Sequence, residues 1–123
     1  MQNQIYHKTG SDFVLANLYK CAEFLILPSF YEGFGVPSLE AMYLSCPVLA
    51  SSNRPLDEVV GDAALKFNPY KVSDISNAMN YYFENKKKIK PVLIKKGLQR
   101  VKNFSWEKMT KEVNEIYKNL NWI

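Results

Sequence analysis

The sequence predicts an α/β fold in which helices pack on a mainly parallel sheet. Short, continuously apolar runs, which suit strands buried on both faces, alternate with segments whose apolar residues recur at helical spacing. The 123 residues suffice for one domain, and 47% hydrophobic and 23% charged residues are typical of a globular protein. No apolar run approaches the ~20 residues that are needed to span a bilayer.

Four short segments in the first half of the chain are predicted to be strands. They cover residues 5–7, 24–27, 47–50 and 64–67. The second run is continuous and ends at Pro28, as expected for a strand covered on both faces. Two helices are predicted between the strands. Ser11 is an N-cap residue type for a helix over about residues 12–21, and Pro37 suits the first turn of a helix that runs to about Leu44.

The second half of the chain is predicted to be helical. Three helices are expected, which begin at Ser73, Pro91 and Ser105. The apolar stripes of the first and third helices are Ile75, Ala78, Met79, Tyr82 and Phe83, and Trp106, Met109, Val113, Ile116, Tyr117 and Leu120. We expect these stripes to be core, packed on the sheet or on a neighbouring domain. The single domain, residues 1–123, would thus comprise an α/β part to about residue 70 and a helical part from about residue 71.

Cysteine and histidine are too few for several kinds of site. Cys21 and Cys46 lack paired C-x-x-C spacing, and we expect both to be small buried residues in a reducing compartment. His7 is the only histidine, which excludes a zinc site built from several His and Cys and argues against a Ser-His-Asp triad. We expect no signal peptide and therefore a cytoplasmic location.

The net charge of +4 is unevenly distributed. Residues 1–85 carry five basic and nine acidic side chains, whereas residues 86–123 carry eleven basic and three acidic ones. One interpretation of the basic half is attraction to anionic lipid or nucleic acid, and the alternative is a solvated helix face. The lysines are not interleaved with stacking aromatics, so we expect no nucleic acid partner. Peripheral membrane contact through residues 86–111 stays open.

The segment that carries most chemical information is residues 32–40, with the sequence Glu-Gly-Phe-Gly-Val-Pro-Ser-Leu-Glu. It follows a buried strand and opens a helix, which places it at the edge where open α/β sheets bind ligands. The helix N-terminus there offers unpaired N–H groups that suit a phosphate. Gly33 and Gly35 allow a positive φ and close approach to a ligand. Ser38 replaces the third glycine of a dinucleotide fingerprint, and no Gly-Lys-Ser/Thr of a P-loop follows.

Two glutamates of this segment are candidate ligand-binding groups. Glu32 precedes the predicted helix, and Glu40 lies about one turn inside it. A carboxylate can accept hydrogen bonds from two vicinal hydroxyls of a sugar, and a charged hydrogen bond contributes ~1.5–3 kcal/mol. The alternative is that both are ordinary acids near a helix start, each favourable by ~0.3–1 kcal/mol. These residues alone leave both interpretations open.

A wider set of residues resembles the signature of family 4 glycosyltransferases, which are retaining, GT-B-fold enzymes that use nucleotide-sugar donors. The matching residues are Pro28-Ser29, Tyr31 to Pro37, Glu40-Ala41 and Pro47-Val48, with Leu18-Tyr19 and Ala22 before them and residues 58–64 and Phe104-Ser105-Trp106 after them. The two glutamates have the family's spacing of seven intervening residues. The resemblance extends over nearly the whole chain.

The resemblance implies a C-terminal, donor-binding Rossmann-like domain, a three-layer half of a GT-B fold that is truncated at its N-terminus and has a helical tail. Glu40 would hold the ribose hydroxyls of the donor, a UDP- or GDP-hexose. Glu32 would be the catalytic residue, near the transferred sugar, where it contacts hydroxyls or stabilises developing charge. The backbone N–H groups that face the sugar and the diphosphate would be those of Gly33, Phe34, Gly35 and Val36. No metal or other cofactor is implied, because protein groups neutralise the leaving diphosphate.

Departures from the family pattern lead to two further expectations. The resemblance implies an Arg and a Lys for the diphosphate, but only Lys8 and Lys20 precede Glu32, so we expect these residues alone to be inactive or nearly so. The strands that flank residues 24–27 in the family are also absent. Either residues 5–7 pair with that bare edge, or another chain covers it, most simply in a homodimer or with an N-terminal-domain partner.

The sequence therefore predicts a glycosyltransferase donor domain that, when complete, transfers a hexose to a glycan or glycolipid acceptor in polysaccharide biosynthesis. The alternative is a non-catalytic module that self-associates or binds a partner and retains a vestigial donor pocket. In either case we expect a cytoplasmic protein, with peripheral contact at the inner face of the membrane as the open alternative.

Overall fold

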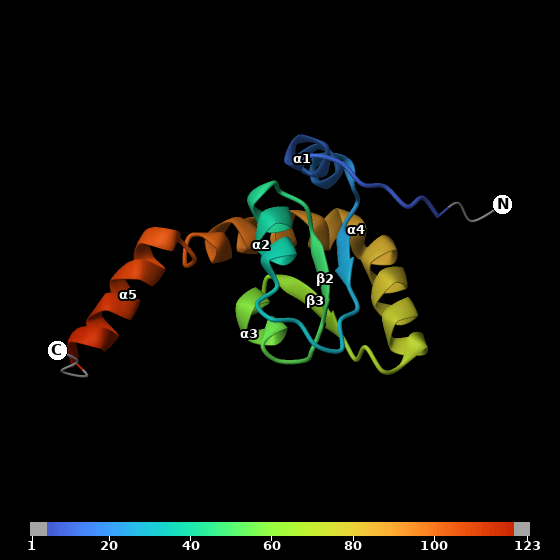
Figure 1. The fold of residues 1–123 in the computed structure, drawn as a ribbon. Coiled ribbons are helices and arrows are strands. Elements are labelled where there is room, and N and C mark those ends of the chain that lie inside the picture. Colours follow the sequence, from blue (N-terminus) through green and yellow to red (C-terminus); the bar gives the residue numbers. More distant parts are fainter. Residues whose placement is uncertain (1–4, 120–123) are drawn as a thin grey trace.

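A parallel sheet of three strands forms the centre of the protein, which a computed structural model describes over residues 5–119 (Figure 1). The strands are β1 (Leu25–Leu27), β2 (Val48–Ser51) and β3 (Ala64–Phe67), in the order β1-β2-β3. The helices are α1 (Asp12–Cys21), α2 (Val36–Tyr43), α3 (Leu56–Val60), α4 (Val72–Val101) and α5 (Trp106–Asn119). The predicted α/β class with a parallel sheet is confirmed, as are three of the four predicted strands.

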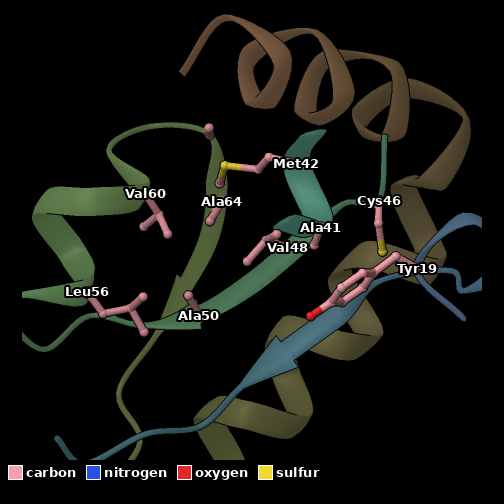
Figure 2. Packing of buried hydrophobic residues seen from close by; sticks show 10 residues of the cluster. Tyr19, Ala41, Met42, Cys46, Val48, Ala50, Leu56, Val60 and Ala64 are labelled. Carbon is pink, nitrogen blue, oxygen red and sulfur yellow. The ribbon is translucent and has the colours of Figure 1, made fainter. Parts of the chain in front are cut away.

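The central strand β2 has a core on each face, which makes the fold three-layered. Val48 and Ala50 point into a cluster with buried side chains of α1, α2 and α3, which Figure 2 shows in close-up. Leu49 points to the opposite face, where it packs with Phe67 and with Tyr82 of α4. All four residues of β2 are buried, which explains why its sequence is continuously apolar up to the final serine.

Local signals set most helix starts. The Ser11 hydroxyl accepts a hydrogen bond from the Val14 N–H at 3.5 Å, and the Ser105 hydroxyl accepts one from the Lys108 N–H at 3.0 Å. Ser73, in contrast, is not a cap, because α4 begins one residue earlier with Lys71 at the N-cap position. The short helix α3 was not predicted.

Residues 5–7 do not form the predicted strand. They lie in irregular backbone, and Ile5 and Tyr6 are 94% and 77% exposed. Three residues without a buried face gain too little burial to offset the entropy lost on ordering them. Within the described residues, the outer edge of β1 therefore has no strand partner.

The two helices predicted on either side of Pro91 are one helix of 30 residues, α4. A proline inside a helix removes one backbone hydrogen bond and commonly bends the helix, and Figure 1 shows that α4 changes direction along its length. Its first part packs on the sheet through Tyr82 and Ile89. Its second part reaches α2, where a Cβ on Gly97 would lie 3.0 Å from the Met42 Cγ. Packing on both sides of the proline holds the helix together.

Two expectations about burial also differ from the structure. Cys46 is buried as expected, but Cys21, at the end of α1, is exposed. The stripe of α5 does not pack on the sheet where it is described, because Val113 and Ile116 are 47% and 59% exposed, and its packing on a neighbouring domain stays a prediction. Leu120 and the side chains of Trp106, Met109 and Tyr117 lie outside what the structure describes. Helix α5 points away from the sheet in Figure 1, and α4 already covers the apolar face on which it would have packed.

None of the helices between residues 5 and 119 combines the length and the apolar character that a membrane crossing requires.

Candidate functional site

The loop that connects β1 to α2 depends on Gly35. This residue is the N-cap of α2, with φ 80° and ψ 36°, in the left-handed region. It is buried, and a Cβ in its place would lie 2.6 Å from the Leu56 Cδ1. The φ of Gly33 is not positive, and a Cβ there would meet no protein atom within 4 Å, while the close approach of its backbone to a ligand stays a prediction. Only the second glycine of the segment is therefore required by the backbone.

The first turn of α2 leaves a group of backbone donors without partners. The Ser38 N–H and hydroxyl both donate to the Gly35 carbonyl, at 3.0 and 2.6 Å, and Ser38 is fully buried. The serine in place of a third glycine thus closes the helix start. No hydrogen bond among the described residues uses the N–H groups of residues 33–36. Unpaired donors at a helix N-terminus have the electrostatic character that attracts an anion.

Glu32 is held within this loop. Its carboxylate accepts a hydrogen bond from the Ser29 hydroxyl at 2.9 Å, and the side chain is half-buried. The loop itself is tied to the next one, because the Asn53 amide donates to the Phe30 carbonyl at 3.0 Å. The end of β1 is tied as well, by the Ser51 hydroxyl, which donates to the Leu27 carbonyl at 3.0 Å. These bonds fix the loop relative to the carboxyl ends of β1 and β2.

Glu40 lies on α2 and is bound by a residue of α1 that the sequence interpretation did not assign to the site. The Tyr19 hydroxyl donates to the Glu40 Oε2 at 3.3 Å. Tyr19 is 8% exposed, and burial, reinforced by the Glu40 carboxylate, raises the pKa of its hydroxyl to about 12. The phenol therefore remains a proton donor at any physiological pH.

A cavity of about 280 Å³ lies between α1 and α2. Tyr19 and Glu40 line it together with Asp12, Leu15 and Tyr43, and none of its lining residues is a cation. Residues 32–36 do not line it either. The structure thus places Glu40 in a cavity of its own, while Glu32 belongs to the loop that precedes α2.

Phe34 connects the loop to the end of α4. Its ring meets the Phe104 ring edge-to-face, with 5.7 Å between centroids, and the Arg100 guanidinium lies 5.3 Å from the Phe104 centroid. Arg100 also donates to the Val59 carbonyl at 2.8 Å and to the Glu58 carbonyl, at the end of α3. The Phe34 side chain therefore has a packing role. Of the residues in these contacts, only Phe104 had stood out in the sequence, as part of the Phe104-Ser105-Trp106 match to the family.

Ion pairs within the protein occupy part of the basic run. Lys86 and Lys90 of α4 lie 2.5 and 3.6 Å from the Glu23 carboxylate, and Lys96 lies 3.4 Å from Asp62. The hydrogen bond from Lys86, with the charges of both lysines, lowers the pKa of Glu23. These three lysines link α4 to the segment between α1 and β1 and to the turn after α3.

Among residues 5–119, no group of three or more His, Cys, Asp and Glu side chains is arranged to hold a metal ion.

Comparison with known proteins gives one consistent result. Residues 1–100 match the family described as glycosyl transferases group 1. The chain is 41% identical over 106 residues to O-antigen chain mannosyltransferase B of Escherichia coli, a match that covers 86% of this chain and 28% of that protein. It is 30% identical over 110 residues to MMP alpha-(1->4)-mannosyltransferase of Mycolicibacterium hassiacum, covering 87% of this chain and 27% of that protein.

A solved structure agrees with these matches. Sucrose-phosphate synthase from Thermosynechococcus elongatus superposes with a TM-score of 0.74 at 29% identity, over 87% of this chain and 27% of that one. The chain thus spans little more than a quarter of the length of these proteins. With its parallel sheet, its glycine-dependent loop and its matched sequence, the chain belongs to the group 1 glycosyltransferases and corresponds to part of the C-terminal domain of their GT-B fold.

Proposed function

We propose that this chain is the donor-binding part of a retaining glycosyltransferase of family 4, which transfers a hexose from a nucleotide-sugar to a glycan or glycolipid acceptor. The observation that carries the proposal is the start of α2, where the N–H groups of residues 33–36 have no partner among the described residues and are flanked in the sequence by Glu32 and Glu40, whose carboxylates accept hydrogen bonds from Ser29 and Tyr19. The names of two relatives, both mannosyltransferases, favour mannose as the hexose.

The proposed roles follow from the charge at each position. The N–H groups of residues 33–36 and the positive end of the α2 dipole suit the diphosphate of the donor. The cavity at Glu40 contains two carboxylates and no cation, so it suits a neutral, hydroxyl-bearing group such as ribose. Glu32 lies on the loop side, where it would contact the sugar or stabilise positive charge that develops during transfer. We propose that the reaction needs no resident metal ion.

Residues 1–123 by themselves are expected to catalyse no measurable transfer. Charged donors that stabilise a leaving group are among the largest contributions to catalysis. Lys8 and Lys20 are the only Lys or Arg residues before Glu32, and both lie outside the loop that offers the N–H groups. Binding of the donor is therefore the property to test first.

Substitution of Glu40 by glutamine is expected to weaken donor binding about 10- to 100-fold, because charged hydrogen bonds of ~1.5–3 kcal/mol are lost. The measurement is an amide NMR titration of the labelled chain with UDP, GDP and their hexose conjugates. Saturable shifts should appear in residues 33–40 of the wild type and require much higher ligand concentrations in Glu40→Gln.

The matched control is Glu58→Gln, which changes an exposed glutamate of α3 whose carboxylate, within residues 5–119, pairs only with Arg54. This variant should titrate as the wild type does. Equal affinities of the wild type and Glu40→Gln for every nucleotide would contradict the assignment of Glu40 to the donor.

The second candidate function is a non-catalytic module that self-associates or binds a partner and retains the donor pocket without using it. It is favoured by the unpaired edge of β1 and by apolar side chains of α1 that remain outside the core, such as Phe13, which is 77% exposed. Open strand edges invite pairing with another chain. Light scattering at micromolar concentration should then give the mass of a dimer, and a monomer mass would count against a homodimer.

We propose a cytoplasmic location. We further propose that residues 86–111 can contact an anionic membrane surface at the inner face. The ion pairs of Lys86, Lys90 and Lys96 reduce the charge that is available for such contact. Lys87 and Lys88 are exposed and form no ion pair within the described residues, and they are the cations that would face the lipid.

A further inference from the structure

The contact between Tyr19 and Glu40 joins two elements that lie 21 residues apart in the sequence. Tyr19 is buried in the cluster below β2, where Figure 2 shows its ring near Cys46, whereas Glu40 is exposed along the cavity. The Tyr19 hydroxyl is the only hydrogen-bond partner of the Glu40 carboxylate among the described residues. The buried Tyr19 side chain thus restrains the Glu40 side chain, which has no other restraint among the described residues.

The bond uses one oxygen of the carboxylate and leaves the other available. Tyr19 donates to Oε2, and no described protein group donates to Oε1. A carboxylate oxygen has two lone-pair sites, so Oε2 can also accept a second hydrogen bond. Both oxygens can therefore receive hydroxyls from a ligand in the cavity while Tyr19 remains bound.

The separation of 3.3 Å is longer than the 2.5–2.7 Å that is common when a hydroxyl donates to a carboxylate. Hydrogen bonds at binding sites are often long in the absence of ligand and shorten when the ligand is present. The raised pKa of the phenol keeps its proton in place throughout. The phenol can therefore keep donating to the Glu40 carboxylate when a ligand binds in the cavity.

We infer that Tyr19 is a positioning residue, which orients the Glu40 carboxylate so that both of its oxygens face a vicinal diol, and thereby makes the site selective for ribose over 2′-deoxyribose. The inference rests on the proposed function, since it assumes that Glu40 meets the nucleotide ribose. A free glutamate must lose the freedom of its side-chain torsions on binding, a cost that corresponds to about two- to tenfold in affinity. The hydrogen bond to Tyr19 restricts these torsions before the ligand binds, so less of that cost is incurred on binding.

The rival explanation is that the bond only fastens α1 to α2. A fastening role would change stability but would not alter the discrimination between two ligands that differ by one hydroxyl. The chain provides a matched control in Tyr82, a fully buried tyrosine that donates to the carbonyl and the carboxylate of Glu23 on the other face of the sheet. Tyr82 makes the same kind of bond but lies outside the cavity.

The test measures the affinities of the 123-residue chain for UDP, GDP, 2′-deoxy-UDP and 2′-deoxy-GDP by NMR titration. The wild type should prefer the ribonucleotide that it binds by about tenfold over the deoxy form. Tyr19→Phe should reduce this ratio at least threefold, mainly through weaker binding of the ribonucleotide. Tyr82→Phe should retain the wild-type ratio even though it loses stability.

The outcomes separate the inference from the proposed function. If Tyr19→Phe keeps the wild-type ratio while Glu40→Gln abolishes it, the positioning role of Tyr19 is wrong and the ribose role of Glu40 stands. If the wild type binds no nucleotide, or does not distinguish ribose from deoxyribose, the ribose role fails and the inference fails with it.

A second measurement applies if Tyr19→Phe does not fold. Incorporation of 3-fluorotyrosine at position 19 preserves the hydroxyl and gives a ¹⁹F signal. That signal should shift on saturation with the ribonucleotide and shift less with the deoxy form. Equal shifts with both ligands would overturn the inference.

Discussion

Replacement of Gly35 by alanine is expected to lower the free energy of unfolding by ~2–5 kcal/mol. A left-handed conformation costs a residue with a Cβ ~1–2 kcal/mol, and overpacking of a core adds ~1–3 kcal/mol. Both apply here, because the φ is 80° and the new Cβ would lie 2.6 Å from the Leu56 Cδ1. Leu56 is 1% exposed and has little room to move away. Urea unfolding followed by circular dichroism measures the change.

Gly33→Ala is the matched control, since its Cβ would meet no atom within 4 Å. This variant should change the free energy of unfolding by less than about 0.5 kcal/mol. A double-mutant cycle with Leu56→Ala separates the two causes, because removal of the Leu56 side chain relieves the clash and leaves the backbone strain. Identical urea midpoints for Gly33→Ala and Gly35→Ala would show that the loop does not require this backbone conformation.

The free energy of unfolding is expected to fall by ~2–3 kcal/mol for each of Tyr19 and Tyr82 as the pH rises from 10 to 12. Burial raises the pKa of both hydroxyls to about 12. In the unfolded chain the same groups lose their protons near pH 10. The unfolded state therefore releases these protons first, so the contribution of each phenol to stability is fully present below pH 10 and is lost between pH 10 and 12.

Tyr19→Phe and Tyr82→Phe test this pH dependence one group at a time. Each variant should lose part of the alkaline decline, although it has lower stability at pH 8 because a hydrogen bond is missing. Burial also raises the pKa of Cys46, so the quantity to compare is the difference between the wild type and each variant at every pH. Parallel curves for the wild type and both variants from pH 8 to 12 would refute the role of the buried phenols.

The fold class and the position of the candidate loop could be predicted from residue patterns alone. Apolar runs such as that before Pro28 became strands of a parallel sheet, and Ser11 and Ser105 cap helices as predicted. These signals are local, because a cap or a buried strand depends on residues within one or two turns of the chain. The order of strand, glycine loop and helix was likewise enough to predict that Glu32 lies in the loop after β1 and Glu40 on the helix that follows it.

Which groups far apart in the sequence come together became clear only from the folded structure. It joined the helices on either side of Pro91, because packing on the sheet and on α2 outweighs the local cost of a proline, and it left residues 5–7 outside the sheet. It also paired Tyr19 with Glu40 and Phe34 with Phe104. Such contacts leave no pattern in the sequence, because the position of each partner reflects only its own helix or loop. The two partners come into contact only after the sheet has brought these elements together.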